Sequence, residues 1–190
     1  MTAAAGIDAM SDAAELFAAS PRRNIELKAR LRDPAAARQI AAALATAPAE
    51  SQRQRDTYFR VRHGRLKLRE IEGRTSQLVW YARTNQFGPK GSDYRLVAVA
   101  HPTELREALA SACGICAVVD KQREVFLYNN VRIHLDVVAD LGDFIEFEAV
   151  LGPEVDDAAG RAQVEFLQTA FRLSADDLLD RSYAEMLPLS

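Results

Sequence analysis

Apolar and polar residues alternate along several short segments of the chain. In residues 24–31, for example, every second side chain is apolar, and those between are polar or charged. A period of two is typical of a β-strand, because successive side chains of a strand point to opposite faces. This alternation, with β-branched and aromatic content, predicts strands over residues 24–31, 56–62, 65–70, 77–83, 93–99, 117–128, 131–137 and 144–151.

Helical signals lie between and after these segments. Asp33 before Pro34 is typical of a helix start, with a capping residue followed by proline at the first helical position. Residues 156–172 instead repeat their apolar positions with a period near 3.6. Helices are therefore predicted over 34–45, 104–111 (capped by Thr103) and 156–172, and Ser174 and Ser182 are predicted caps of two short closing helices.

Eight strands joined mostly by short turns predict an α+β fold: an eight-stranded antiparallel β-barrel with flanking helices. Closure of the sheet removes its exposed edges. Asn129-Asn130 is a predicted hairpin turn, since asparagine tolerates positive φ. We expect one domain over residues 21–190, preceded by an alanine-rich flexible tail or short helix at residues 1–20.

The composition agrees with a soluble globular domain and narrows the choice of partners. The chain has 190 residues, is 48% hydrophobic and carries a net charge of −3, which argues against nucleic acid and membrane as partners. No segment approaches the ~18 apolar residues of a membrane span. Residues 1–20 contain no Lys or Arg, unlike a secretory signal, and the chain has only two cysteines. We therefore expect a cytoplasmic protein.

Charged and polar side chains share one face in five of the predicted strands. These sets are Asn24, Glu26, Lys28 and Arg30; Arg65, Lys67 and Arg69; Lys121 and Arg123; Arg132, His134 and Asp136; and Glu146 and Glu148. For any one strand, a solvated outer face is the favoured interpretation. In four of these strands, however, the partners on the opposite face are bulky and apolar, so helices packed against them would turn the charges toward the barrel interior. These partners are Ile25, Leu27, Leu66, Leu68, Ile133, Leu135, Ile145 and Phe147.

Such an interior would hold many cations and few carboxylates, with Arg83, Lys90 and Arg95 adding to the cations. Buried charges must be paired or must bind ions. A triphosphate held by Lys and Arg, together with Mg²⁺ or Mn²⁺ held by Glu and Asp, would satisfy this set, because such hard cations prefer oxygen ligands.

Six segments carry a more specific signal. They are N-I-E-L-K-A-R at 24–30, D-T-Y-F at 56–59, G-R-L-K-L-R-E at 64–70, G-P-K-G-S-D-Y at 88–94, V-D-K-Q-R at 119–123 and R-I-H-L-D-V-V-A-D-L-G-D-F-I-E-F-E at 132–148. In these segments the chain resembles the CYTH superfamily, the triphosphate tunnel metalloenzymes, and most of all its class IV adenylyl cyclase-like branch. The resemblance extends over nearly all of the chain except its first twenty residues.

This resemblance implies an eight-stranded tunnel that binds a triphosphate-containing small molecule with Mg²⁺ or Mn²⁺, and it suggests a homodimer. It implies Lys28 and Asp136 as catalytic residues. The implied metal ligands are Glu26, Asp136, Glu146 and Glu148. The implied phosphate-binding residues are Lys28, Arg30, Lys67, Arg69, Arg83, Lys90, Lys121, Arg123 and Arg132. Arginine suits this role because its planar fork binds two phosphate oxygens at once.

One position departs from the family's pattern. The first strand of the family carries Glu-x-Glu-x-Lys, whereas this chain has Asn24, Glu26 and Lys28 at those places. Asparagine keeps a neutral oxygen and loses a charge. A second metal ion would therefore bind more weakly here, or not at all.

Two reactions and one binding function remain open. Resemblance favours cyclisation of ATP to cyclic AMP and pyrophosphate. Hydrolysis of inorganic, thiamine or nucleoside triphosphate needs the same cations, and a fold does not fix a reaction. The third alternative is a non-catalytic triphosphate- or polyphosphate-binding module, although an anion binder gains nothing from Glu26, Glu146 and Glu148 in its cavity.

Other residues carry weaker signals. Cys113 and Cys116 form a C-x-x-C pair without a second pair for zinc, so we expect a structural role. His134 is expected to hydrogen-bond a neighbour or a phosphate rather than to act as a base. Asp56 is expected either to shape the tunnel or to pack, and Trp80 to lie in the core.

Overall fold

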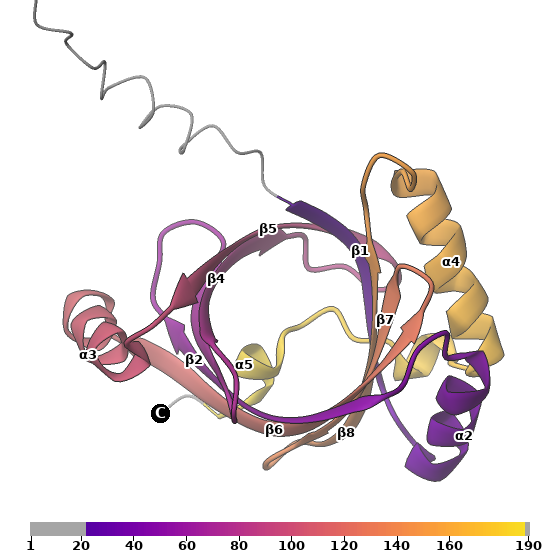
Figure 1. The fold of residues 1–190 in the computed structure, drawn as a ribbon, viewed down its shortest axis with the longest axis horizontal. Helices are drawn as coiled ribbons and strands as arrows, with labels where there is room; N and C mark the ends of the chain where they lie inside the picture. The colour runs from indigo at the N-terminus through magenta and orange to yellow at the C-terminus, as the bar shows by residue number, and fades with distance from the viewer. Residues whose placement is uncertain (1–21, 189–190) are drawn as a thin grey trace, which may run out of the picture.

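Eight antiparallel strands close into a barrel in the computed structural model of the protein, which describes residues 22–188 (Figure 1). Around the barrel the strands follow the order β1-β5-β4-β3-β2-β6-β7-β8. The strands are β1 (Arg22–Arg30), β2 (Glu50–Phe59), β3 (Arg65–Ile71), β4 (Ser76–Arg83), β5 (Lys90–Val99), β6 (Ile115–Tyr128), β7 (Val131–Val138) and β8 (Gly142–Val150). The predicted fold class is confirmed.

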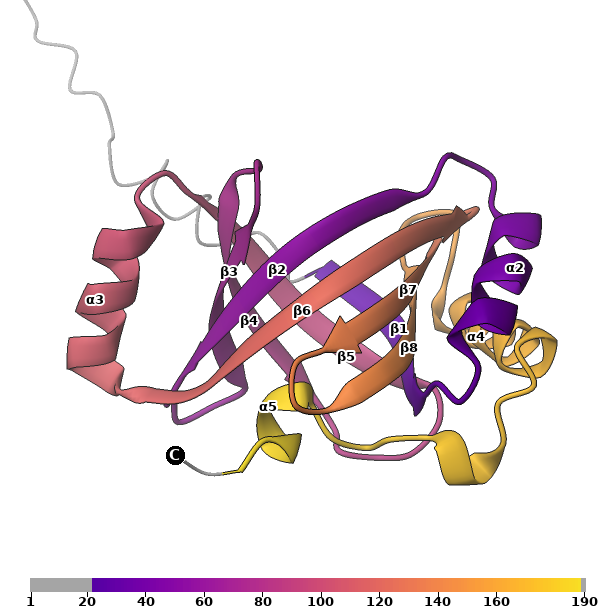
Figure 2. The same cartoon turned by 90° about the horizontal axis from the view of Figure 1, so that it is seen from below.

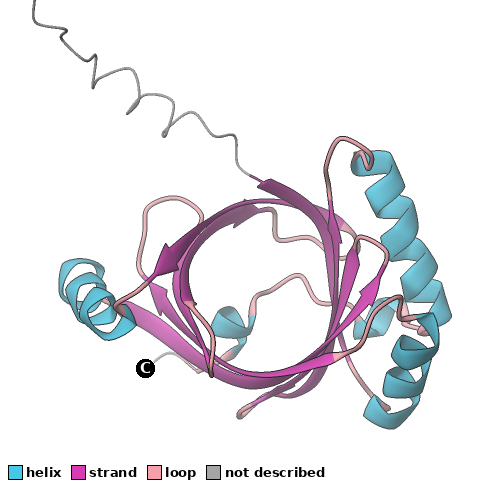
Figure 3. Cartoon of the chain, in the orientation of Figure 1, coloured by secondary structure: helices cyan, strands magenta, loops and turns pink. Residues whose placement is uncertain are grey.

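Helices flank the outside of this ring and close one of its ends. Figure 3 shows two helices side by side against one wall of the barrel and another on the far side. They are α2 (Pro34–Leu44), α3 (Pro102–Cys113), α4 (Asp157–Ala170), the 3-10 helix η1 (Ala175–Asp177) and α5 (Tyr183–Met186). Seen from the side in Figure 2, α5 lies at one end of the barrel.

The outer apolar faces of β1, β7 and β8 form the main core with α2 and α4. Ile25, Ile133 and Phe147 are fully buried there, and Val164 and Leu167 of α4 pack against the same cluster. Because side chains alternate along a strand, this packing turns the charged faces of the same strands inward. The expected helical cover over the apolar faces is thus present, and it decides which way the charges point.

Local chemistry explains where the helices begin. The side chains of Asp33 and Asp156 accept hydrogen bonds from the first turns of α2 and α4. Capping boxes at Ser174 and Ser182 begin η1 and α5, as predicted. The predicted cap at Thr103 is wrong: α3 begins earlier, with Pro102 at its first position after His101.

Two other expectations differ from the structure. β2 begins at Glu50 rather than at residue 56, because its first half is polar on both faces and shows no apolar alternation. Trp80 lies half-buried on the outer face of β4, where its indole nitrogen donates to the carbonyl of His63. The predicted tail at residues 1–20 lies outside the described residues. Within residues 22–188, every helix is too short or too polar to cross a membrane.

Candidate functional site

A cavity of about 670 Å³ opens into the barrel and is lined by the inward faces of all eight strands. The lining alternates with the core residues along each strand, as a period of two requires. Its basic residues are Lys28, Lys67, Arg69, Arg74, Arg83, Lys121, Arg123 and Arg132, and its acidic residues are Glu26, Glu50, Glu146 and Glu148. Cations therefore outnumber carboxylates in the cavity wall.

Helix α5 closes one end of this cavity. The ring of Tyr183 packs against Phe144 at the start of β8, with centroids 4.9 Å apart, and the ammonium of Lys28 lies 3.1 Å from the Tyr183 ring centroid. The backbone N–H of Leu179 donates to the carbonyl of Lys28 at 2.9 Å. The C-terminal segment thus forms the floor of the cavity. Above this floor, Glu146 and Glu148 face the cavity from β8 and lie roughly 7 Å apart along the strand.

The open end has a different lining. Its apolar surface comes from Pro48, Tyr94, Leu96, Val125 and Leu127, and its polar groups include Gln77 and the ion pair between Arg74 and Glu50. This open end, called the mouth below, is not predicted by the sequence analysis. The polar half of β2 that contributes Glu50, Gln52 and Gln54 carries no periodic signal, and the apolar residues resemble ordinary core positions.

One buried carboxylate, Asp56, organises three cations on one side of the cavity. It is fully buried, and its oxygens accept from Lys67 at 2.9 Å, Lys121 at 3.0 Å and Arg69 at 2.8 Å. Burial raises the pKa of a carboxyl, but Arg69, Lys121 and Lys67 outweigh it and hold the pKa of Asp56 well below its usual range. Burial, with Arg123 and Arg69 adding to it, lowers the pKa of Lys121 to about 7. Asp56 therefore shapes the tunnel.

A second network joins Asp136, Arg123 and Glu146. Arg123 donates to both oxygens of Asp136 at 2.6 and 2.5 Å and to Glu146 at 2.6 Å, and Lys28 forms an ion pair with Glu146. The hydroxyl of Tyr183 donates to Asp136 at 2.8 Å. Asp136 is thereby enclosed and lies outside the cavity lining. Its oxygens serve here as the counter-charge that orients Arg123, and its roles as a metal ligand and catalytic group stay predictions.

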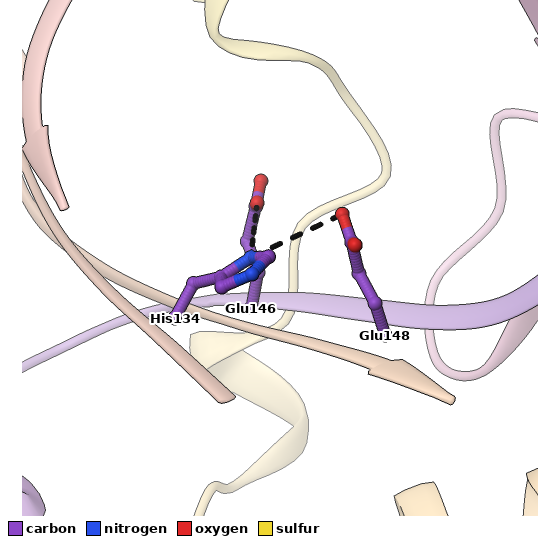
Figure 4. Close-up of side chains that lie close together, drawn as sticks. All are labelled: His134, Glu146 and Glu148. Atoms are coloured by element: carbon purple, nitrogen blue, oxygen red, sulfur yellow. Dashed lines mark ion pairs between the residues drawn. The ribbon is translucent and has the colours of Figure 1, made fainter. Parts of the chain in front are cut away.

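Within residues 22–188, one group of side chains could hold a metal ion: His134, Glu146 and Glu148, whose ligand atoms lie within 4.8 Å of one another (Figure 4). The Nδ1 atom of His134 lies 3.6 Å from Glu146 and 3.9 Å from Glu148. Although burial opposes it, the neighbouring His134 and Arg132 lower the pKa of Glu148 to about 2. The donor set therefore includes ionised oxygen ligands, which suit a divalent cation.

Glu26 stands opposite this cluster on the neighbouring strand. The register pairs Glu26 with Glu148 across β1 and β8, and Arg83 forms an ion pair with Glu26 at 2.9 Å. Burial raises the pKa of Glu26, and Glu148 and Glu146 add to the effect, while Arg83 opposes it. Positive charge brought between these carboxylates would relieve their repulsion. On this ground the carboxylates present fit a divalent cation.

Three other expected site residues have distinct places. Arg30 is exposed at the end of β1, with its guanidinium carbon 5.3 Å from the Phe144 ring centroid, so it lies outside the cavity. The ammonium of Lys90 donates to the carbonyls of Gln86 and Leu179 and so fastens the floor to a loop instead of facing the cavity. Asn24 lines the cavity, and its buried side-chain oxygen has no hydrogen-bond partner within residues 22–188.

Comparisons with known proteins agree with this geometry. The CYTH domain model matches residues 22–183. The PH1012 protein of Pyrococcus horikoshii OT3 is 21% identical, with a TM-score of 0.76 over 87% of this chain and 99% of that one. A candidate adenylate cyclase from Vibrio parahaemolyticus is 20% identical, with a TM-score of 0.68 over 87% and 98%.

A third solved structure is that of a Hippeastrum protein, a candidate adenylyl cyclase with a dominant triphosphatase activity. It is 13% identical, with a TM-score of 0.57 over 86% of this chain and 93% of that one. At these identities the likeness shows a shared fold. No curated protein matches the chain.

Proposed function

The chain belongs to the CYTH domain family, and from this premise we propose that it is a metal-dependent enzyme that acts on a nucleoside triphosphate inside the barrel. The reaction that we put first converts ATP to cyclic AMP and pyrophosphate. The alternative is hydrolysis of a triphosphate on the same residues.

The observation that carries this proposal is the unbalanced charge of a cavity closed at one end. Asp56 alone serves Lys67, Arg69 and Lys121, so these three cations keep an excess of positive charge in a buried place. Such an excess is costly unless an anion enters. A triphosphate chain carries several negative oxygens in a row, and cations along the wall would neutralise them one after another.

The different linings of the two ends of the cavity favour an organic triphosphate as the ligand. The cations at the floor, among them Lys28 beside Tyr183, suit the outer phosphates. The apolar mouth around Tyr94 and Leu127 suits a base and sugar, which would extend toward solvent. A cavity of about 670 Å³ is also within the usual range for a ligand of this size.

Cyclisation would place the developing charge at the floor. The ribose 3′-oxygen loses its proton and bonds to the α-phosphorus, while the bond from that phosphorus to the bridging oxygen breaks and pyrophosphate leaves with the electron pair. Lys28, Lys67 and Lys121 would hold the leaving pyrophosphate, and such prearranged charge lowers the barrier of phosphoryl transfer. Glu26, Glu146 and Glu148 would hold the divalent cation, which when bound supplies Lewis acidity and aligns the phosphates.

Hydrolysis is favoured by one contact. Glu146 is an ion-pair partner of Lys28 at the floor, so a carboxylate lies beside the cations that would bind the terminal phosphate. A water held there would bond to the terminal phosphorus and give up a proton to solvent, while the bond from that phosphorus to the bridging oxygen breaks and the remaining phosphate chain leaves with the electron pair. Both reactions therefore make the same demands on the cations and differ in how deeply the triphosphate chain lies.

A product assay tests the proposal. Pure protein is incubated with ATP, inorganic triphosphate or thiamine triphosphate and with Mg²⁺ or Mn²⁺, and cyclic AMP, pyrophosphate and orthophosphate are separated. Cyclic AMP with pyrophosphate supports the cyclase. Orthophosphate without cyclic AMP supports the hydrolase. Absence of turnover with every substrate, combined with tight triphosphate binding, would contradict an enzyme and favour the binding module.

Two variants and a control connect the activity to the cavity. Arg69→Ala should weaken binding of inorganic triphosphate about 10- to 100-fold, as expected for loss of a charge-assisted contact. Glu146→Gln should abolish metal-dependent turnover. Arg38→Ala removes an ion pair with Glu124 on the outer surface and should change neither. If Arg38→Ala reduced binding or turnover as much as Arg69→Ala and Glu146→Gln do, the assignment of the activity to the cavity would be contradicted.

A further inference from the structure

We propose that the imidazole Nδ1 of His134 is itself a ligand of the divalent cation, so that the site prefers Mn²⁺, which accepts nitrogen donors, over Mg²⁺. This inference rests on the metal dependence included in the proposed function. It goes beyond the carboxylate set, because it adds a nitrogen atom and a consequence for the choice of metal.

The geometry of His134 carries the inference. The residue is 4% exposed, and its buried Nδ1 has no hydrogen-bond partner among the described residues. The same atom points toward Glu146 and Glu148, at 3.6 and 3.9 Å (Figure 4). A buried polar nitrogen without a partner costs free energy. A cation between the ring and the two carboxylates would give that nitrogen a partner.

The strands fix this arrangement. His134 lies directly across from Glu146 in the pairing of β7 with β8, and Glu148 is the next residue on the same face of β8. The Glu148 oxygen nearest to the imidazole is Oε1, whereas Arg132 binds Oε2. Oε1 is therefore turned toward the imidazole. Glu146 already binds Arg123 and Lys28, but each carboxylate oxygen has a further lone-pair site.

The donor types determine which ion is favoured. Mg²⁺ prefers oxygen ligands and retains water, whereas imidazole suits transition ions. Mn²⁺ accepts carboxylate oxygen as well as imidazole nitrogen. One nitrogen and two carboxylates around one position therefore favour Mn²⁺ over Mg²⁺, and we expect Mn²⁺ to bind about tenfold or more tightly than Mg²⁺.

Pulsed electron paramagnetic resonance of bound Mn²⁺, without any triphosphate, tests the ligand directly. A coordinated imidazole gives ¹⁴N modulation, and labelling the histidines with ¹⁵N should change its frequency. The untagged full chain is used. Absence of nitrogen modulation from bound Mn²⁺ would overturn the inference, and so would absence of Mn²⁺ binding.

Two variants locate the nitrogen. His134→Gln replaces the nitrogen donor by an amide oxygen, so the modulation should vanish and the Mn²⁺ preference over Mg²⁺ should fall to about twofold or less. His101→Gln changes an exposed histidine that begins α3 and makes no side-chain cap, and it should keep both signals. Nitrogen modulation that survives in His134→Gln would overturn the inference. Because wild-type protein already gives the labelled spectrum, the test does not depend on the folding of the variant.

The outcomes separate this inference from the proposed function. Turnover with Mg²⁺ or Mn²⁺ but without nitrogen modulation would leave the enzyme in place and reject His134 as a ligand. Nitrogen modulation without turnover of any triphosphate would support the ligand and reject the enzyme.

Discussion

At the scale of single residues, the buried and incompletely paired charges of the barrel interior lower the stability of the protein. Asp56 holds Lys67, Lys121 and Arg69 in fixed positions, but one carboxylate cannot neutralise three cations. Buried charges gain less from their mutual attraction than they lose in hydration, so such clusters rarely serve stability alone. The cations are therefore held in fixed positions but are not neutralised. An incoming polyanion would supply the missing negative charge.

Because of Lys121, the positive charge around Asp56 should depend measurably on pH. Its pKa of about 7 means that the free protein loses a cavity charge as pH rises through neutrality. A bound triphosphate favours the protonated form, so affinity for inorganic triphosphate should fall about tenfold over roughly one pH unit above 7. Calorimetry in two buffers of different ionisation enthalpy should detect proton uptake on binding near pH 8.

Lys121→Arg supplies the control for this prediction. Arginine stays charged across this range, so the variant should show a flatter pH profile and little proton uptake. The ligand titrates identically with both proteins, and the difference between them therefore belongs to Lys121. Equal proton uptake by the two proteins would contradict the assignment.

Asn24 allows a second test at the same scale. Its side-chain oxygen is buried and has no hydrogen-bond partner in the part of the chain that the structure describes, and Glu26 lies on the same face of β1. Asn24→Glu adds a carboxylate to the cavity wall beside Glu26, which is one of the proposed metal ligands. Without metal the added repulsion should lower the melting temperature, whereas Mn²⁺ affinity should rise by about tenfold, or ~1.4 kcal/mol. Asn24→Gln has nearly the same size without the charge, and it should leave Mn²⁺ affinity unchanged; a gain in both variants would exclude charge as the cause.

Which residues share a face could be predicted from the sequence, but not which charges pair. Alternation places Lys28 with Glu26 and Arg123 with Lys121 correctly, since a period of two is local. The enclosure of Asp136 by Arg123 and Tyr183 depends on a residue from the far end of the chain. The same holds for Lys90, whose partner Leu179 lies in the floor segment. Arg30 fits the alternation but sits too close to the strand end to reach the cavity.

At the scale of elements, α4 fixes the position of β1. A Cβ atom on Gly160 would lie 2.6 Å from Cδ2 of Leu151 and 3.1 Å from Cγ1 of Ile25, so helix and strand are in close contact. Ile25 and Leu27 face this helix, while Glu26 and Lys28 on the same strand face the cavity. Displacement of α4 would therefore move the part of the cavity wall that carries Glu26 and Lys28.

Gly160→Val tests this coupling. Overpacking of the contact should lower the free energy of unfolding by about 1–3 kcal/mol more than Ala159→Val does. Ala159 is its exposed neighbour in α4. Replacing glycine costs about 1 kcal/mol less in helix propensity than replacing alanine, so the measured difference understates the overpacking by that amount. Urea unfolding measures the difference, and Gly160→Val should also bind inorganic triphosphate more weakly. Equal stability of the two variants would show that the contact can relax.

The sequence indicates the limits of some strands more closely than those of others, and the reason is physical. Strands with one buried face, such as β1 and β7, show a clear period and were found near their true limits. The first half of β2 faces the cavity on one side and solvent on the other, so both faces are polar and the pattern disappears. The short helix α5 was recognised by its cap, but its role as a floor depends on tertiary contacts of Tyr183.

At the scale of the whole molecule, stability should depend on the carboxylates inside the barrel. Neighbouring cations lower the pKa values of Asp56, Asp136, Glu146 and Glu148, the last to about 2, against the opposing effect of burial. A carboxyl with a depressed folded pKa contributes stability above its unfolded pKa and loses it as pH falls toward the folded value. The protein should therefore lose stability steeply between about pH 4 and pH 2. Glu124→Gln, at the outer ion pair with Arg38, should leave this profile nearly unchanged, because exposed pairs contribute little.

Asp56→Asn connects this stability to the proposed ligand. Removing the carboxylate leaves three cations unpaired in a buried place and should cost about 3–5 kcal/mol at neutral pH. If a polyanion is the intended counter-charge, inorganic triphosphate should raise the melting temperature of the variant more than that of the wild type, whereas sulfate at equal ionic strength should raise both alike. Thermal unfolding with each anion measures this. An equal shift by triphosphate in both proteins would mean that the Asp56 cations do not face the ligand.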